Sequence, residues 1–268
     1  MERIRACLEG SGIPVSDRQL EQLETYLQMV VEKNKVMNLT AITEREEFIE
    51  KHSAIMDRYD PDCRIGLMVD EWGTWYDVEE GTNPGFLYQQ NTIRDALIAC
   101  INLNIFNKHC KRVKMANIAQ LVNVLQAVIL TEGDKMVKTP TYYVFKMFSC
   151  HQDGELLEST LNSEKIGLED EYMVPNLHES VSRGKDGKIH ITLGNLSCTD
   201  AYDVASTLMG ASIKSVKATV LAGRMDDHNT FDQPDVVFEK AFDDISFEGD
   251  KITFKIPASS VMHIEVEI

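Results

Sequence analysis

The hydrophobic period of the sequence changes near residue 150. Before that point, short apolar runs alternate with longer helical patterns. After it, apolar and polar residues alternate with a period of two, between turns rich in Gly, Asp and Asn. Helices and half-buried strands impose these two different periods on the side chains that share a face. We therefore expect an α/β part followed by an all-β part.

The α/β part, residues 53–150, is predicted to contain two βα units and a further helix. The expected elements are a strand at 64–72 ("RIGLMVDEW"), a helix at 86–109, a strand at 113–120 ("VKMANIAQ"), a helix at 121–130 and a helix at 140–152 opened by Pro140. Both apolar runs are typical of buried parallel strands. Functional side chains gather at the carboxyl ends of such strands.

The all-β part, residues 151–268, is predicted to be an antiparallel β-sandwich. Alternating segments at 188–196, 212–223 and 251–268 are separated by turns, and no long helical pattern interrupts them. Before the α/β part, residues 1–52 are predicted to form a helical segment. Ser16 with Gln19 and Thr43 with Glu46 have the spacing of capping boxes, which open helices.

Composition limits the functions open to this chain of 268 residues. No apolar run approaches the roughly 18 residues of a membrane helix, and the first residues have no apolar core of a secretory signal. We therefore expect no membrane partner and a cytoplasmic location. Six scattered cysteines without a C-x-x-C pair argue against a zinc site or a disulfide framework. Residues 151–268 carry 22 acidic and 10 basic side chains, a net −12, which argues against nucleic-acid binding.

The first apolar run ends in an acid pair beside both tryptophans of the chain, Trp72 and Trp75. An acid at a strand end can cap the next element or pair with a base. It can also be a catalytic carboxylate in a pocket walled by aromatic rings. Because side chains alternate along a strand, Asp70 is expected to point away from Glu71 and to be structural.

Residues 52–268 resemble the C-terminal half of the α-L-arabinofuranosidases of glycoside hydrolase family 51, with "VDEWGTWY" and "NIAQLVNV" as the most specific motifs. The resemblance implies the end of a (β/α)8 barrel followed by a β-sandwich. It implies that Glu71 is the catalytic nucleophile, that Trp75 lines the sugar site and that Gln120 hydrogen-bonds the arabinofuranose ring. It further implies cleavage of terminal arabinofuranosyl groups from oligosaccharides or polysaccharides, with retention and without a metal or other cofactor.

The same resemblance predicts an incomplete enzyme. A retaining glycosidase uses two carboxylates, a nucleophile and an acid/base, and the acid/base glutamate of the family has no counterpart upstream of Glu71. A whole barrel takes about 250 residues, and residues 53–150 supply only its last two βα units. We expect a chain with little or no activity alone, which self-associates through the incomplete barrel unless the N-terminal helices cover part of it. The alternative is a non-catalytic carbohydrate-binding or assembly module.

Residues 1–52 resemble a different family, the small-subunit ribosomal RNA guanine methyltransferases of the glucose-inhibited-division B type. The marker is "NKVMNLTAIT" within the N-terminal helices. No glycine-rich loop for S-adenosylmethionine follows, so methyl transfer is not expected. We interpret the chain as a fusion with its junction near Lys51 and His52, and an RNA-related role as the least favoured function.

Overall fold

The computed structural model describes residues 16–19, 21, 42–168 and 172–268. Contacts between residues divide the chain into two compact units, Met1–Glu44 and Arg45–Ile268. In the first unit, the backbone N–H of Ser16 donates to Gln19 Oε1 (2.9 Å), and that of Gln19 donates to Ser16 Oγ (3.3 Å). These reciprocal bonds are the expected capping box. The other predicted helices of residues 1–41 lie outside the described residues.

Helix α3 spans Ile42–Tyr59. The predicted cap at Thr43 lies outside the described side chains. The elements that follow are β1 (Leu67–Trp72), η1 (Pro84–Phe86), α4 (Ile93–Lys108), β2 (Val113–Ile118), β3 (Ile129–Glu132), β4 (Lys135–Lys138), α5 (Pro140–Phe148) and η2 (Ser149–His151). None of the helices in the described part of the chain is long and apolar enough to cross a lipid bilayer.

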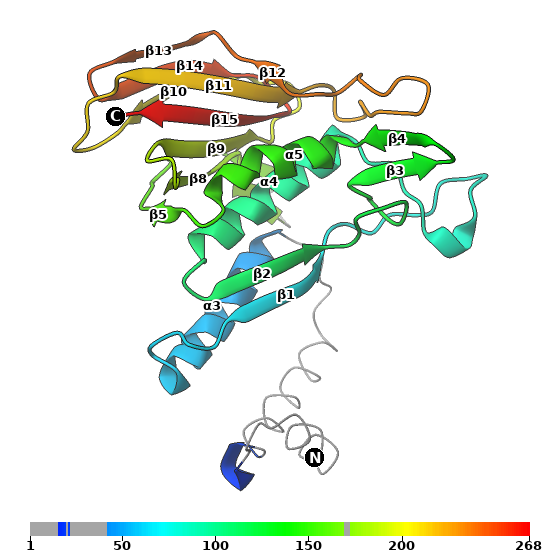
Figure 1. Cartoon of the computed structure of the whole chain (residues 1–268), viewed down its shortest axis with the longest axis horizontal. Helices are drawn as coiled ribbons and strands as arrows, with labels where there is room; N and C mark the ends of the chain where they lie inside the picture. Colours follow the sequence, from blue (N-terminus) through cyan, green and yellow to red (C-terminus); the bar gives the residue numbers. More distant parts are fainter. Residues whose placement is uncertain (1–15, 20, 22–41, 169–171) are drawn as a thin grey trace. The chain divides into compact units, whose positions relative to one another are not determined.

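Strands β1 and β2 pair in parallel, and α4 connects them (Figure 1). The predicted strands and the connecting helix are therefore present. The helix begins at Ile93, later than expected, because Thr92 caps it: the Thr92 hydroxyl accepts from Arg94 N, and Asp95 Oδ2 accepts from Thr92 N (2.8 Å). This capping box fixes where the loop after β1 ends.

The predicted helix at 121–130 is wrong. Asn123 and Leu125 have positive φ angles of 60° and 55°, which a right-handed helix does not contain. The segment instead forms a loop that leads into a hairpin of β3 and β4. Leu125, Ala127, Val128 and Leu130 are buried, whereas Leu121 and Val122 are exposed. The left-handed backbone at two positions breaks the helical repeat.

Both parallel strands have apolar sequences typical of buried strands, and two βα units alone were expected to leave apolar strand faces without partners. Met68 on β1 and Met115 on β2 are each 48% exposed. Helix α4 lies on one side of the strand pair in Figure 1, and on the other side we find no packed layer among the described residues. These two apolar side chains therefore have no covering layer within the described part of the chain.

The remaining strands form the predicted antiparallel β-sandwich and a separate hairpin of β6 and β7. They are β5 (Glu155–Leu157), β6 (Lys165–Leu168), β7 (Tyr172–Pro175), β8 (Leu177–Arg183), β9 (Ile189–Asn195), β10 (Tyr202–Thr207), β11 (Ser215–Ala222), β12 (Lys240–Ala241), β13 (Ile245–Glu248), β14 (Lys251–Ile256) and β15 (Ser260–Glu267). One sheet has the order β12-β11-β15-β9-β8-β5, and the other has the order β10-β14-β13.

The two sheets enclose an apolar core. Residues at alternate positions of the facing strands, such as Ile189, Leu193, Ile252, Ile256 and Ile264, are at most 3% exposed. The period of two seen in the sequence therefore marks the faces that meet. Helices α4 and α5 lie along the opposite face of the six-stranded sheet (Figure 1).

The contact between α4 and the six-stranded sheet is partly polar. Asn104 on α4 is buried, and its Oδ1 accepts hydrogen bonds from Ser180 Oγ (2.7 Å) and Thr192 Oγ1 (2.8 Å) of the sheet. His151 at the end of η2 bonds Ser182 Oγ and Thr192 Oγ1. Because buried polar groups need partners at defined positions, this network fixes the helix layer on the sheet.

A buried ion pair joins α3 to the start of β2. Arg112, 3% exposed, donates from Nη1 to Asp60 Oδ2 (2.9 Å) and to Ile65 O (2.8 Å). The Ile65 N–H donates to the same Asp60 oxygen, and these bonds hold the pKa of Asp60 down at about 2. A carboxyl with a lowered folded-state pKa stabilises the fold above its unfolded-state pKa, and this contribution is lost as the pH falls toward 2.

Replacing the carboxylate tests this pair. We expect Asp60→Asn to lower the melting temperature at pH 7, because Arg112 loses its buried charge partner. The difference from the parent protein should shrink as the pH falls from about 4 toward 2, where Asp60 becomes protonated. Thermal melts followed by circular dichroism give both quantities. Asp62→Asn, on the exposed turn after α3, is the matched control, and identical melts for the parent and Asp60→Asn would contradict the assignment.

Candidate functional site

The carboxyl ends of β1 and β2 lie side by side and bring two of the predicted site residues to one edge. Trp72 is paired with Ile118, and the Ala119 N–H donates to Trp72 O (2.9 Å). Glu71 is the residue before Trp72 on β1. Gln120 lies two residues after Ile118 on the other strand, and the peptide bond between Ala119 and Gln120 is cis. The side chains of Glu71 and Gln120 are both exposed.

The two tryptophans have opposite environments. Trp72 is 3% exposed, and its ring packs edge-on against Phe106 of α4 (centroids 5.6 Å apart) and stacks near Phe145 of α5 (6.0 Å). Trp75 is 67% exposed. Trp72 therefore anchors the strand end in the helix layer, and only Trp75 presents a ring that a ligand can reach.

The loop that carries Trp75 is held to the segment before α4 by a buried glutamine. Gln89 Nε2 donates to Thr74 O (3.1 Å), and Gln89 Oε1 accepts from Tyr76 N (2.7 Å). The two bonds bracket Trp75 in the chain. At the start of the loop, Gly73 has a φ of +143°, and a Cβ there would lie 2.1 Å from the Gln126 amide. The loop path thus depends on a glycine and on two buried amides.

Asp95 is the charged group behind this loop. Its carboxylate is fully buried; it accepts from Thr92 N, from Thr74 Oγ1 (3.2 Å) and from Arg94 Nη2 (3.1 Å). Burial raises the pKa of Asp95, and the hydrogen bonds and Arg94 oppose that rise. Arg94 in turn lies 3.7 Å from the centroid of the Tyr76 ring. The Asp95 carboxylate therefore contacts the start of α4, the loop at Thr74 and the Arg94 side chain that stacks on Tyr76.

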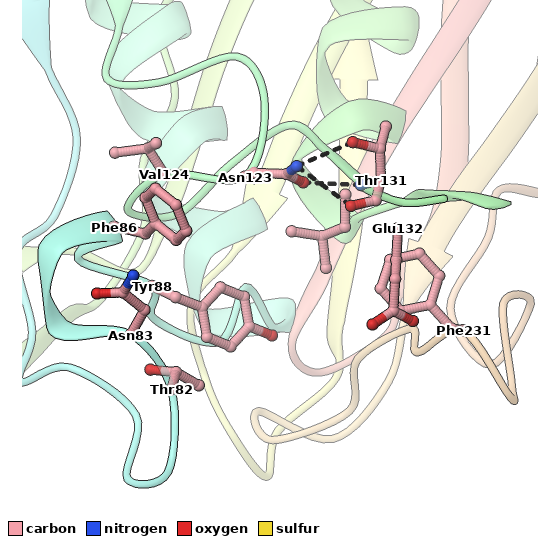
Figure 2. Close-up of a pocket in the computed structure, with 10 residues that line it drawn as sticks. Thr82, Asn83, Phe86, Tyr88, Asn123, Val124, Thr131, Glu132 and Phe231 are labelled. Carbon is pink, nitrogen blue, oxygen red and sulfur yellow. Dashed lines mark hydrogen bonds between the residues drawn. The ribbon is translucent and has the colours of Figure 1, made fainter. Parts of the chain in front are cut away.

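A hollow of about 420 Å³ lies among the loops beyond these strand ends (Figure 2). Its lining is Thr82, Asn83, Phe86, Tyr88, Asn123, Val124, Leu130, Thr131, Glu132 and Phe231. Asn123 shapes one wall, because its amide donates to Thr131 O and Oγ1 and its Oδ1 accepts from Thr131 N (2.7 Å). Glu71, Trp75 and Gln120 are not among the lining residues.

Sequence reasoning identified the exposed residues of this edge and missed the buried ones that hold it. Gln89, Asp95 and Gln126 are polar, buried and distant in sequence from Glu71. One signal was readable: Thr92 and Asp95 have the spacing of a capping box. The contacts of Gln89 and Gln126 with Thr74 depend on the loop path and have no local pattern.

Comparison with known proteins decides the family. The model described as the alpha-L-arabinofuranosidase C-terminal domain matches residues 70–260. The chain belongs to this family. This arabinofuranosidase-family chain is 44% identical over 225 residues to an intracellular exo-alpha-L-arabinofuranosidase of Bacteroides ovatus, a match that covers 84% of the chain and 44% of that protein.

A solved structure supports the same relationship. The GH51 arabinofuranosidase from Xanthomonas axonopodis pv. citri matches with a TM-score of 0.80 and 44% identity, over 83% of this chain and 45% of that one. The arabinofuranosidase-family chain thus spans less than half the length of these two relatives. The second resemblance is also confirmed: ribosomal RNA small subunit methyltransferase G of Bacillus cereus is 56% identical over 52 residues, 19% of this chain and 22% of that protein.

The contrast between the two tryptophans predicts opposite mutational effects. Trp72→Ala should lower the free energy of unfolding by ~3–5 kcal/mol, because it leaves a cavity beside Phe106 and Phe145. Trp75→Ala should change it by less than about 0.5 kcal/mol, since the ring is mostly in solvent. Urea unfolding of both variants measures these energies. Equal effects would show that the strand end is packed differently.

Proposed function

We propose that this chain is an arabinofuranosidase fragment that keeps the attacking carboxylate and part of the sugar site but does not hydrolyse glycosides alone. The observation that carries the proposal is the position of Glu71 and Gln120 at neighbouring carboxyl ends of β1 and β2. In βα proteins that edge is where catalytic side chains gather. Trp75, exposed and held by the Gln89 clamp, supplies a flat ring in the loop that follows Glu71.

In this proposal, β1, α4, β2 and α5 are the last two βα units of a (β/α)8 barrel. The parallel pairing of β1 with β2 and the exposed apolar face at Met68 and Met115 support it. The domains would be a methyltransferase-like helical segment at 1–52, the barrel end at 53–150 and the sandwich at 151–268. The contact boundary between Glu44 and Arg45 lies near the proposed fusion junction.

The proposed chemistry assigns one role to each site residue. Glu71 would attack the anomeric carbon of a terminal α-L-arabinofuranosyl group of an arabinan or arabinoxylan, and Gln120 would hydrogen-bond a ring hydroxyl. Retaining hydrolysis then requires a second carboxyl group about 5 Å away to protonate the leaving oxygen. In the sequence pattern of the family this group comes from an earlier barrel strand. Without it, an alkyl leaving group would depart as an unprotonated alkoxide, which is unfavourable.

Two further parts of the proposal concern the surroundings of the chain. The exposed apolar face of the β1–β2 pair favours self-association. An open sheet edge offers unpaired backbone groups, and exposed apolar side chains gain stability when they are buried. We also propose a cytoplasmic location, in keeping with the word intracellular in the name of the Bacteroides ovatus relative. Neither nucleic acid nor membrane is a proposed partner.

An activity assay tests the missing proton donor. We expect the purified chain to hydrolyse an α-linked arabino-oligosaccharide, whose leaving group is a sugar hydroxyl that needs protonation, no faster than its Glu71→Gln variant. The full-length Bacteroides ovatus relative is the positive control for the substrate. Turnover by the chain that disappears in Glu71→Gln would contradict the proposal and would mean that another carboxyl group, from this chain or a second copy, serves as the acid.

A binding measurement tests the retained sugar contacts and separates the non-catalytic module from an inert fragment. We expect arabino-oligosaccharides to bind with a Kd of about 1 mM. Trp75→Ala should weaken binding about 2–10-fold, which corresponds to loss of one stacking contact. Isothermal titration calorimetry measures both. Phe247→Ala, an exposed aromatic residue on β13, is the control, and absence of heat at millimolar ligand would end the binding proposal.

A further inference from the structure

Three side chains with metal-binding atoms meet at the edge of the sandwich, away from the strand ends described above. Cys150 lies in η2, His190 in β9 and His263 in β15, and one ligand atom from each lies within 4.8 Å of the others. His190 Nδ1 is 3.1 Å from His263 Nε2. No arabinose-site residue belongs to this group.

The pairing of β9 with β15 places both histidines on one face of the sheet. His190 is opposite Glu265, and His263 is opposite Thr192, so the two histidines are diagonal neighbours across the antiparallel pair. Alternation turns them toward the helix layer, because the neighbouring Ile189 and Ile264 face the sandwich core. Helix α5 packs against this sheet, and Cys150 lies in η2, which follows α5 directly.

The carboxylate of Asp186 contacts the ring nitrogen of His190 that faces away from His263. Asp186 Oδ1 lies 3.2 Å from His190 Nε2. An Nε2–H donated to Asp186 leaves Nδ1 with a free lone pair on the side of Cys150 and His263. Gly184 permits this approach, since a Cβ there would be 2.7 Å from Asp186 Oδ1 and 2.8 Å from His190 Nε2. A carboxylate bound to the outer nitrogen of an imidazole is the usual arrangement behind metal-ligating histidines.

The three side chains differ in their exposure to solvent. His190 is 5% exposed, whereas Cys150 and His263 are only partly buried. The ammonium of Lys188, two residues before His190, is paired with Glu265 (2.7 Å). The thiol of Cys150 lies 3.1 Å from Met147 O and can turn toward the histidines about its Cα–Cβ bond.

We propose that Cys150, His190 and His263 bind a borderline-soft divalent metal ion, of which zinc is the best match, with Asp186 orienting His190. One thiolate and two imidazoles are a ligand set that zinc prefers, with a water molecule as the fourth ligand. Ligand atoms on a tetrahedral zinc ion lie about 3.5 Å apart. The two histidine nitrogens, 3.1 Å apart, are already near that spacing, and the Cys150 sulfur lies within 4.8 Å of them.

Binding requires one proton to leave. A cysteine without a metal ion is mostly a thiol at neutral pH, because the ordinary pKa of the group is about 8.5. On binding, the thiol proton passes to solvent and the sulfur coordinates as thiolate. The proton on the His263 ring moves to Nδ1, which frees Nε2. The bound ion would cross-link the end of α5 to β9 and β15.

The scattered cysteines, without a C-x-x-C pair, predicted no zinc site. The proposed ligands give no such signal because they are far apart in the sequence. Zinc motifs are recognised by short spacings such as C-x-x-C, whereas these ligands are separated by 40 and 73 residues. Only the pairing of β9 with β15 and the end of α5 bring them together. A dispersed site of this kind carries no local signal.

Cobalt substitution tests the proposal on the full chain. After removal of metal with a chelator, we expect one equivalent of Co²⁺ to produce a thiolate-to-cobalt charge-transfer band and the intense visible bands of a tetrahedral site. Zinc should displace the cobalt with the same stoichiometry and raise the melting temperature. Cys150→Ser should abolish the charge-transfer band and lower zinc affinity at least ~100-fold. Asp186→Asn should keep the fold and the band but lower zinc affinity ~10–100-fold.

The controls separate this site from others in the chain. Cys110→Ser removes an exposed cysteine, and His109→Asn disrupts a second group, Glu46, Glu50 and His109, whose ligand atoms are also close together. Both variants should bind cobalt like the parent. No charge-transfer band in the parent, or a band that persists in Cys150→Ser, would overturn the proposal. If Cys150→Ser does not fold, an Asp186→Asn affinity equal to the parent's would overturn it instead.

Discussion

The buried carboxylate of Asp95 is the interaction on which the strand-end site depends. It completes the capping box of α4 through Thr92, and it accepts a hydrogen bond from Thr74 in the loop after Glu71. A buried carboxylate without these partners would be strongly unfavourable, so the helix start and the loop are fixed together. The position of Trp75 relative to Glu71 follows from that shared group, with Gln89 as a second clamp.

The six-stranded sheet and the β1–β2 pair differ in how many of their faces are covered. The six-stranded sheet is covered on one face by β10, β13 and β14 and on the other by α4 and α5, with the Asn104 network between them. Within the described residues, the β1–β2 pair has such a cover on only one side, and Glu71 at the end of β1 is exposed to solvent.

Two regions of the molecule therefore have different physical characters. The sandwich has a closed core, and the cluster of Cys150, His190 and His263 stands on its helix-facing side. The strand pair is open on the side of Met68 and Met115 within the described residues. A metal cross-link in the closed part would stabilise it independently of whether the open part meets a partner.

Hydrophobic period and motifs determined much by themselves: β1, α4, β2, α5, the antiparallel sandwich, the family, and the exposed strand-end residues Glu71 and Gln120. Tertiary structure alone decided that Trp72 is buried while Trp75 is exposed, that residues 121–128 leave the helical repeat, and that Met68 and Met115 lack cover. It also decided the meeting of Cys150 with two histidines. The physical reason is the same in each case. A periodic sequence fixes which side chains share a face, but what lies against that face is set by elements far away in the chain.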